Sequence, residues 1–282
     1  MRVLVTGGSG FVGSHLIKEL KKEHEVINYD IKEGKDILDA EGLGKENADV
    51  VFHLAADPDV KSSINPEKCF KINVIGSYNV LEFARKNNAG IVFISSSTVY
   101  GNGTNFKEDS PLRPVSNYGA SKAAVEMMIR SYHHSYGIKA TIVRPANIYG
   151  EGSTHGVMFD FYNKLKKNSR ELEILGNGLQ RKSYIYISDA VSGIITAWEN
   201  GKDFGIYNLS TDKTTSVNEI ASLICRELGV NPFLKYTGGE RGWVGDIPAI
   251  SLNNEKLKSL GWKPRICLEE GIRRYINWLS KR

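Results

Sequence analysis

Short apolar runs alternate with helix-like segments through the first half of the chain. Four runs enriched in β-branched or other apolar residues are typical of buried parallel strands: residues 2–6, 25–30, 50–54 and 91–94. Between the first two runs, residues 14–20 carry apolar side chains three or four positions apart, as an amphipathic helix does. Strands that alternate with helices predict an α/β fold with a doubly wound parallel sheet.

Two further helices are predicted in the last third of the chain. Ser216-Val217-Asn218-Glu219 has the form of a capping box, so we expect a helix over residues 220–228 that stops at Gly229. Residues 269–279 have the periodicity of a closing amphipathic helix. Both helices are interpreted as scaffold.

The length of 282 residues allows one large domain or two modest ones. We expect residues 1–150 to form a first domain, to which residues 181–205 return. Residues 151–282 should form mainly a smaller C-terminal α/β domain.

Composition and charge indicate an ordinary globular protein with no extended basic surface. The net charge of +5 comes from 37 basic and 32 acidic residues that are mixed along the chain, which mildly favours anionic ligands such as phosphates over nucleic acid. No stretch approaches the ~20 apolar residues that span a bilayer, so we expect no membrane partner. The three cysteines are scattered, which indicates reduced thiols and a cytoplasmic protein. No ligand spacing suggests a metal site.

A glycine-rich turn joins the first strand to the first helix. Residues 7–13 read Gly-Gly-Ser-Gly-Phe-Val-Gly, and glycine lets the backbone approach a pyrophosphate while the helix N-terminus supplies N–H groups. Asp30 ends the second strand 20 residues after Gly10, where a dinucleotide fold hydrogen-bonds the adenosine ribose. A carboxylate there would repel a 2′-phosphate. The pattern therefore predicts a Rossmann-type site that favours NAD over NADP.

Tyr118 and Lys122 form a candidate proton-transfer pair. Their spacing of four places both side chains on one helical face, with Cβ atoms about 5–6 Å apart. A phenol has an ordinary pKa near 10, and a nearby ammonium lowers that pKa toward the working range. The same spacing also arises by chance, in which case the tyrosine is half buried beside a solvated lysine.

These motifs together resemble the extended short-chain dehydrogenase/reductase family over nearly the whole chain. The Gly-x-x-Gly-x-x-Gly spacing is usual in that family, and Asp36-Ile37, residues 50–56, residues 73–77 and residues 91–101 resemble further family motifs in the family's order. The resemblance implies NAD as cofactor. It assigns cofactor contacts to Gly7, Gly10, Phe11, Val12, Gly13, Asp30, Asp36, Ile37, Leu54, Ala55, Ala56, Asn73, Ser95, Tyr118, Lys122 and Pro145.

One segment departs from the family pattern. Asp30 and Asp36 are only six residues apart, where the family usually has a crossover with a helix. A parallel crossover needs at least ten or so residues. We therefore expect no normal second βαβ unit, and Asp36 would reach the adenine from a shortened loop.

By the same resemblance, Ser96, Tyr118 and Lys122 are the catalytic residues. In family members the active hydroxyl lies three residues before the Val of Val-Tyr-Gly, which selects Ser96 from the three serines at 95–97. Tyr118 would take and return the proton of a substrate hydroxyl to which Ser96 also binds. Lys122 would bind the nicotinamide ribose, and the positive nicotinamide ring would add to the lowering of the phenol pKa.

Substrate contacts are implied on the C-terminal side of the chain. Residues 144–150 resemble an element whose Asn binds the diphosphate of a nucleotide sugar, which makes Asn147 a candidate. Lys182 stands where the family usually has Arg, with Arg181 just before it, so either residue is a candidate for the diphosphate. Arg241 and Asp246 resemble the element that closes on diphosphate and ribose. The implied substrate ligands are Ser96, Tyr118, Asn147, Lys182, Arg241 and Asp246.

The residues after Ser96 discriminate between reactions of the family. Sugar 4,6-dehydratases and related decarboxylases carry an acidic residue there, whereas Ser97 and Thr98 follow here. The resemblance therefore implies 4-epimerisation of a UDP-sugar by transient oxidation at C4, as in UDP-glucose 4-epimerases, together with a homodimer formed by helices near residues 75–85 and 120–132. Ile250 replaces a bulky Tyr of some epimerases, which suggests tolerance of N-acetylhexosamines. Alternatives are a uronate epimerase, a reductase, or a catalytically silent NAD-binding sensor.

Overall fold

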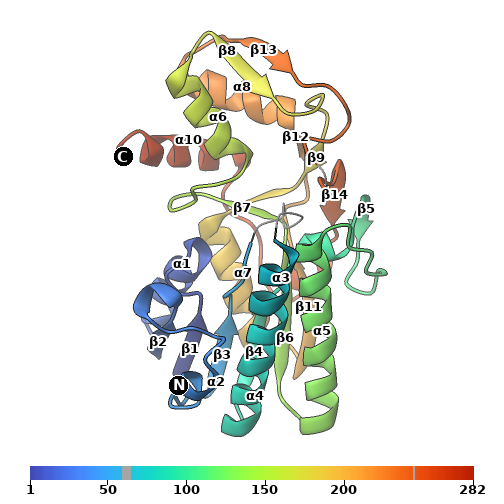
Figure 1. Ribbon diagram of the computed structural model, residues 1–282. Coiled ribbons are helices and arrows are strands. Elements are labelled where there is room, and N and C mark those ends of the chain that lie inside the picture. The colour runs from blue at the N-terminus through green and yellow to red at the C-terminus, as the bar shows by residue number, and fades with distance from the viewer. Residues whose placement is uncertain (59–64, 244) are drawn as a thin grey trace.

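A six-stranded parallel sheet lies at the centre of the molecule (Figure 1). The computed structural model describes residues 1–58, 65–243 and 245–282. The strand order is β11-β6-β4-β3-β1-β2, and every neighbouring pair is parallel. The strands are β1 (Arg2–Thr6), β2 (Glu25–Tyr29), β3 (Val50–His53), β4 (Gly90–Ile94), β6 (Ala140–Pro145) and β11 (Phe204–Leu209). The predicted α/β fold with a parallel sheet is confirmed.

Helices cover both faces of this sheet. Successive residues of a strand point to opposite faces, so Val3 and Val5 join one apolar cluster while Leu4 joins another. Helices α1 (Phe11–Leu20) and α7 (Ile187–Glu199) pack on the first face. Helices α4 (Ser77–Asn87) and α5 (Asn117–Tyr136) pack on the second face, as Figure 1 shows.

The sheet ends at β2, which confirms the predicted departure from a second βαβ unit. After β2 the chain forms a 3₁₀ turn, η1 (Ile31–Glu33), and one short helix, α2 (Ala40–Leu43), before it enters β3. Strand β3 lies on the far side of β1 from β2. Asp30 and Asp36 are therefore linked by a compact loop at the sheet edge.

Three smaller sheets and three helices lie beyond the carboxyl ends of the central strands (Figure 1). The sheet strands are β5 (Gly103–Phe106), β7 (Asn147–Tyr149), β8 (Glu171–Ile174), β9 (Arg181–Lys182), β10 (Tyr184–Tyr186), β12 (Thr215–Ser216), β13 (Phe233–Tyr236) and β14 (Ala249–Leu252). The helices are α6 (Val157–Lys167), α8 (Val217–Leu228) and α10 (Leu268–Leu279). The remaining short helices are α3 (Pro66–Phe70), the π-helix η2 (Lys71–Gly76), the 3₁₀ helix η3 (Ser97–Val99) and α9 (Glu255–Lys258).

One apolar cluster runs from the first face of the sheet into this upper part of the molecule. It joins Val3 and Val5 of β1 to Ile220 of α8 and Ile276 of α10. The segment after residue 181 contributes α7 and β11 to the central sheet layer. The division into a first domain and a smaller second domain stays a prediction.

The two helix predictions for the last third of the chain are confirmed. Ser216 Oγ accepts a hydrogen bond from Glu219 N at 3.1 Å, and Glu219 Oε2 accepts one from Ser216 N at 2.7 Å, which completes the capping box of α8. Gly229 ends α8 in the left-handed conformation at φ +65°. Among the residues that the structure describes, no helix is long and apolar enough to cross a membrane.

Candidate active site

The glycine turn brings the carboxyl ends of β1 and β3 and the start of α1 into close contact. Gly7 has φ +71°, and a Cβ there would lie 2.7 Å from the Ala55 backbone nitrogen. A Cβ on Gly13 would lie 2.2 Å from the Gly7 carbonyl oxygen, so this glycine lets α1 pack against the turn. In this described segment Gly10 caps α1 without a side-chain hydrogen bond, and the first turn holds no acidic residue. The first N–H groups of α1 are therefore suited to a phosphate.

Asp30 is held beside the glycine turn. Its Oδ2 accepts a hydrogen bond from Ser9 N at 3.0 Å, and its Oδ1 accepts one from Lys32 N at 2.9 Å. Each carboxylate oxygen has a second lone pair. The carboxylate is thus fixed in orientation while it keeps acceptor capacity for two ribose hydroxyls.

Asp36 and Ile37 are less directly exposed to a ligand than the sequence suggested. Asp36 Oδ1 accepts from Leu38 N at 2.9 Å, and the Ile37 side chain is buried against Gly76 of η2. Their predicted contact with adenine stays a prediction.

Buried polar side chains support the loop that follows β3. His53 is fully buried between Thr6 Oγ1, 2.7 Å from Nδ1, and Ser77 Oγ, 2.8 Å from Nε2; burial lowers its pKa to about 3, so the ring is neutral. Asn73 Oδ1 accepts from Asp57 N at 2.7 Å, and Asn73 Nδ2 donates to Ser121 Oγ at 3.0 Å. Leu54, Ala55 and Ala56 are half-buried in this loop. The Asn73 amide therefore links the loop to α5.

The three serines at 95–97 lie in a turn after β4. Strand β4 ends at Ile94, and Ser96 caps the 3₁₀ helix η3, with its Oγ accepting from Thr98 N at 3.2 Å and from Thr98 Oγ1 at 2.9 Å. Ser95 and Ser97 are buried, whereas Ser96 is half-buried. The turn thus presents the hydroxyl that was predicted to be catalytic.

A close approach between α5 and this turn brings Tyr118 to Ser96. Ser116 caps α5 by accepting from Gly119 N at 3.1 Å. A Cβ on Gly119 would lie 2.8 Å from the Thr98 carbonyl oxygen, so glycine is what permits the contact. The Ser96 hydroxyl lies near enough to the Tyr118 phenol to lower the pKa of the phenol. The structure therefore joins two of the three predicted catalytic residues.

Lys122 lies one turn further along α5, beneath the Tyr118 ring. Its side chain is only 3% exposed, its Nζ donates to the Ile94 carbonyl at 2.8 Å, and the Nζ is 5.8 Å from the centre of the Tyr118 ring. Burial lowers the pKa of Lys122 to about 8, although the negative charge of Glu126 opposes the change. The lysine is thus desolvated. The alternative interpretation, in which the spacing arose by chance and the lysine is solvated, does not apply.

The predicted lowering of the Tyr118 pKa by Lys122 is wrong for the protein alone. Burial raises the pKa of Tyr118 to about 12, and the hydrogen bond from Ser96 lowers it only in part. The physical reason is that the Lys122 ammonium binds a backbone carbonyl and lies against the aromatic ring instead of the phenol oxygen. The further lowering by a positively charged nicotinamide ring stays a prediction.

On the substrate side, Lys182 and Asp246 form a nearly buried ion pair. Lys182 Nζ lies 2.6 Å from Asp246 Oδ1, and the two side chains are 16% and 3% exposed. Asp246 Oδ2 accepts from Gly242 N at 2.9 Å within the loop before β14, and the ion pair ties this loop to Lys182 of β9. Arg181 points elsewhere, because its guanidinium binds Glu219 at 3.1 Å and the Thr214 carbonyl at 3.1 Å. The geometry favours Lys182 over Arg181 as the cation that faces the substrate side.

The remaining substrate candidates lie near this pair. Asn147 is exposed and its Nδ2 donates to the carbonyl of Ser183, the residue after Lys182, at 3.2 Å. Arg241 is exposed, and its backbone lies beside Gly176. Pro145, a predicted cofactor residue, is buried at the end of β6, two residues before Asn147.

Known proteins share both this sequence and this architecture. Residues 3–210 match the family model described as the NAD dependent epimerase/dehydratase family. The chain belongs to that family. A solved UDP-galactose 4-epimerase is 35% identical to it with a TM-score of 0.89, over 100% of this chain and 99% of the other.

Two further relatives show the range of reactions in the family. A UDP-glucose 4-epimerase from Thermotoga maritima, solved with UDP-glucose, is 30% identical with a TM-score of 0.92, over 100% of this chain and 99% of the other. A dTDP-D-glucose 4,6-dehydratase from Mus musculus is 30% identical over 99% of this chain and 89% of its own length. The resemblance to the extended short-chain dehydrogenase/reductases is thereby confirmed.

NAD is the cofactor of this family, and the residues present fit it. The glycine turn leaves space that a Cβ at Gly7 would fill, α1 begins after Gly10 without a side-chain cap, and the Asp30 carboxylate is oriented for the adenosine ribose. The Tyr118 phenol lies near the Ser96 hydroxyl. This pair can take the proton of a substrate hydroxyl when the carbon that bears the hydroxyl loses a hydride. The contacts of individual residues with NAD stay predictions.

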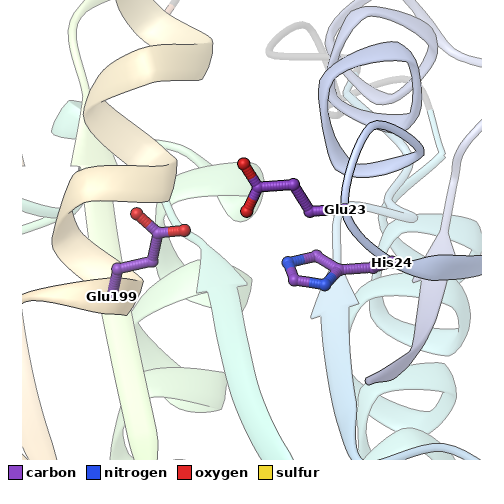
Figure 2. A group of neighbouring side chains, drawn as sticks. All are labelled: Glu23, His24 and Glu199. Carbon is purple, nitrogen blue, oxygen red and sulfur yellow. The ribbon is translucent and has the colours of Figure 1, made fainter.

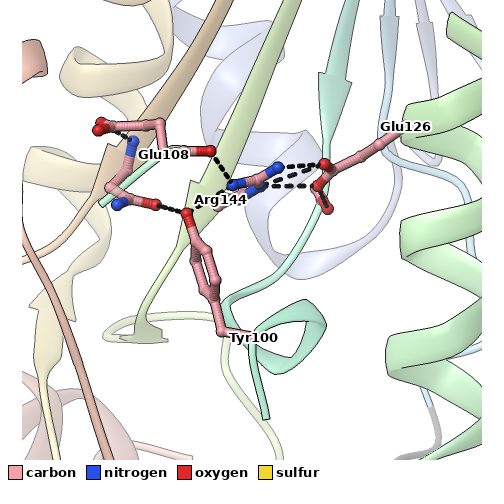
Figure 3. Close-up of polar contacts among 6 residues, drawn as sticks. Tyr100, Glu108, Glu126 and Arg144 are labelled. Atoms are coloured by element: carbon pink, nitrogen blue, oxygen red, sulfur yellow. Dashed lines mark hydrogen bonds and ion pairs between the residues drawn. The ribbon is translucent and has the colours of Figure 1, made fainter. Parts of the chain in front are cut away.

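Sequence reasoning missed a buried polar network behind the catalytic residues (Figure 3). Glu126 of α5 is paired with Arg144 of β6 at 2.5 Å, and Arg144 Nη1 also donates to Tyr100 Oη at 2.6 Å and to the Glu108 carbonyl at 2.9 Å. Ser95, predicted to contact the cofactor, instead donates its hydroxyl to Glu126 Oε1 at 2.5 Å. An acid at the fourth position after Lys122, on the same helical face, is the signal that could have revealed this network.

One group of potential metal ligands lies away from this site. Within the described ranges, Glu23, His24 and Glu199 place ligand atoms within 4.8 Å of one another (Figure 2). Glu23 and His24 precede β2 and Glu199 ends α7, so the group is at the amino edge of the sheet. Both glutamates are exposed. The group therefore has no part in the chemistry at Ser96 and Tyr118.

Proposed function

We propose that the protein is a UDP-sugar 4-epimerase that interconverts UDP-glucose and UDP-galactose. The observation that carries this proposal is the Ser96–Thr98 turn. The Thr98 hydroxyl lies 2.9 Å from Ser96 Oγ, and, by the family resemblance, Ser97 and Thr98 follow the catalytic hydroxyl where sugar dehydratases carry an acid for the elimination of water. Without that acid, the ketone formed at C4 does not go on to lose water and is reduced back to a hydroxyl.

The side chains supply the proton chemistry of such a reaction. Tyr118 takes the proton of the sugar C4 hydroxyl as the C4–H bond breaks, and Ser96 donates a hydrogen bond to the same oxygen. NAD, when bound, accepts the hydride from C4 and later returns it. After the keto sugar has turned, the proton on Tyr118 returns to the C4 oxygen while the hydride returns to C4. The complete reaction therefore consumes no cofactor. Lys122 would bind the nicotinamide ribose, and the positive nicotinamide ring of the bound cofactor would lower the pKa of Tyr118.

Binding of the nucleotide diphosphate is assigned to Lys182, Asn147 and Arg241. Lys182 is held by Asp246, and its Nζ lies 5.2 Å from the centre of the Trp243 ring. These two contacts orient the Lys182 ammonium toward the substrate side. Ile250 pairs in register with Lys182 and is buried beside Val99 and Tyr100. Because an isoleucine is smaller than the tyrosine of restricted epimerases, we extend the proposal to UDP-N-acetylhexosamines as second substrates.

The proposal includes a cytoplasmic homodimer. Ile75, Tyr78 and Met127 expose 41%, 47% and 47% of their surface on η2, α4 and α5, which lie side by side (Figure 1). Apolar side chains exposed together on neighbouring helices favour association. Cys69, Cys225 and Cys267 are free thiols, which suits a reducing compartment.

A substrate panel tests the proposed reaction. The purified protein is incubated with NAD and, separately, with UDP-glucose, UDP-N-acetylglucosamine, UDP-glucuronic acid and dTDP-glucose, and the products are resolved by chromatography and mass. We expect UDP-galactose from UDP-glucose without net change in absorbance at 340 nm. Loss of one water mass would indicate a dehydratase, turnover of the uronate alone a uronate epimerase, and stoichiometric consumption of NADH in a parallel incubation with NADH a reductase. NAD binding without any turnover would favour a silent sensor.

A further inference from the structure

The carboxyl end of β4 is joined to α5 by three consecutive polar contacts. The Ile94 carbonyl accepts from Lys122 Nζ at 2.8 Å, Ser95 Oγ donates to Glu126 Oε1 at 2.5 Å, and the Ser96 hydroxyl lies near the Tyr118 phenol, whose pKa it lowers. The partners on α5 are spaced by four residues and therefore lie on one helical face. The first and third contacts involve proposed catalytic groups, whereas the second involves a residue to which no role was assigned.

Glu126 is itself fixed from the opposite side. Its carboxylate receives Arg144 Nε at 3.0 Å and Nη2 at 2.5 Å, and the side chains of the pair are 0% and 2% exposed. Arg144 Nη1 continues to the Tyr100 phenol and the Glu108 carbonyl (Figure 3). Glu126 is thus placed by two groups of Arg144 and by the Ser95 hydroxyl, which come from two other segments of the chain.

Stability alone does not account for such an arrangement. Desolvation of two charges offsets most of their attraction, and a well-packed apolar pair of the same volume is often as stable or more stable. What an apolar pair cannot do is fix the direction of the Ser95 hydroxyl, and through it the backbone that carries Ser96. The cluster therefore has a geometric consequence at the catalytic turn.

We propose that Glu126, held by Arg144, is a positioning residue: through Ser95 it sets the distance between the Ser96 turn and α5 at which the Ser96 hydroxyl meets the Tyr118 phenol. This inference rests on the proposed function. It assigns to the Ser95 side chain a role in alignment and not in cofactor contact, since that side chain is 2% exposed and directed at Glu126.

The variant Ser95→Ala removes this contact and leaves the Glu126–Arg144 pair intact. We expect kcat to fall at least tenfold, with the KM for UDP-glucose and the affinity for NAD within about threefold of wild type. Ser97→Ala, a buried serine of the same turn, is the matched control and should keep kcat. A kcat within twofold of wild type at a temperature where Ser95→Ala is fully folded would overturn the proposal, and so would a large loss of NAD affinity.

A second variant and a measurement without substrate separate the positioning role from a folding defect and from failure of the proposed reaction. Glu126→Met combined with Arg144→Met removes the anchor of Ser95 without leaving a buried charge unpaired, and it should reproduce the loss of kcat. With ¹³Cζ-labelled tyrosine, the Tyr118 resonance, identified by its absence in Tyr118→Phe, should shift in Ser95→Ala and stay in place in Ser97→Ala. An unmoved resonance contradicts the positioning role. Absence of turnover in the wild type with a shifted resonance contradicts only the proposed reaction.

Discussion

Replacement of Lys122 by methionine should stabilise the protein at neutral pH while it abolishes catalysis. The Lys122 side chain is 3% exposed, and burial lowers its pKa from 10.5 to about 8. Between these two values the unfolded chain binds a proton that the folded chain does not, so the free energy of unfolding rises with pH in this window. Below about pH 8 both states hold the proton, and the whole unfavourable contribution of the buried charge is present.

The size of the effect follows from the change in pKa. The lowering of the Lys122 pKa from 10.5 to about 8 corresponds to about 3 kcal/mol. Methionine keeps an unbranched stem but loses the hydrogen bond from Nζ to the Ile94 carbonyl, which offsets roughly 1–2 kcal/mol. At pH 7 Lys122→Met should therefore be more stable than wild type by about 1–2 kcal/mol. Near pH 10 the wild type has recovered about 2–3 kcal/mol, and the order should reverse.

Denaturant unfolding of both proteins at pH 7 and pH 10, with fitted m-values, measures this reversal. Lys18→Met on the exposed face of α1 is the control, and it should stay within about 0.5 kcal/mol of wild type at both pH values. Turnover of UDP-glucose should fall by orders of magnitude in Lys122→Met alone. A Lys122→Met protein that is less stable than wild type at pH 7, or a stability difference that does not change with pH, would refute the reasoning.

Four shorter predictions address the rest of the site. Tyr118→Phe should bind NAD normally in an equilibrium titration but lose about 10²–10⁴-fold in kcat; near-normal turnover would remove Tyr118 from the mechanism. Gly7→Ala should weaken NAD binding more than tenfold, because its Cβ would lie 2.7 Å from the Ala55 nitrogen, whereas Gly34→Ala, with φ +74° in open space, adds only backbone strain. Lys182→Met should raise the KM for UDP-glucose at least tenfold, and Arg181→Met should not; equal effects would contradict the assignment. Met127→Glu should convert a dimer to a monomer in light scattering, and a wild-type monomer would reject the proposed interface.

The central fold could be predicted from the sequence because its signals are local. Apolar runs of four to six residues mark strands that are buried on both faces. The glycine turn after residues 2–6 could be predicted because a tight connection from a strand to a helix requires glycine. The short spacing between Asp30 and Asp36 was sufficient to predict the missing crossover, since chain length limits what can be built there.

The candidate site was only partly predictable, since its decisive contacts join residues far apart in the chain. Lys182 and Asp246 are 64 residues apart, and nothing in either local sequence says that they pair. The end of β4 before Ser95 depends on tertiary packing, because the close approach of Gly119 to the Thr98 carbonyl fixes the turn. The raised pKa of Tyr118 reflects burial, which a one-dimensional spacing rule does not contain.

The charges buried around α5 do not by themselves make Tyr118 a base in the protein alone. Arg144 is neutralised by Glu126 in a nearly fully buried pair, so the positive charge of Lys122 is left against a neutral carbonyl and two aromatic rings. Such a charge is unfavourable by itself, which is why the Lys122 pKa falls to about 8. Ser96 lowers the pKa of Tyr118 in the protein alone, but burial outweighs it. The positive nicotinamide ring of bound NAD is therefore the charge that we expect to favour the phenolate that proton transfer from the sugar requires.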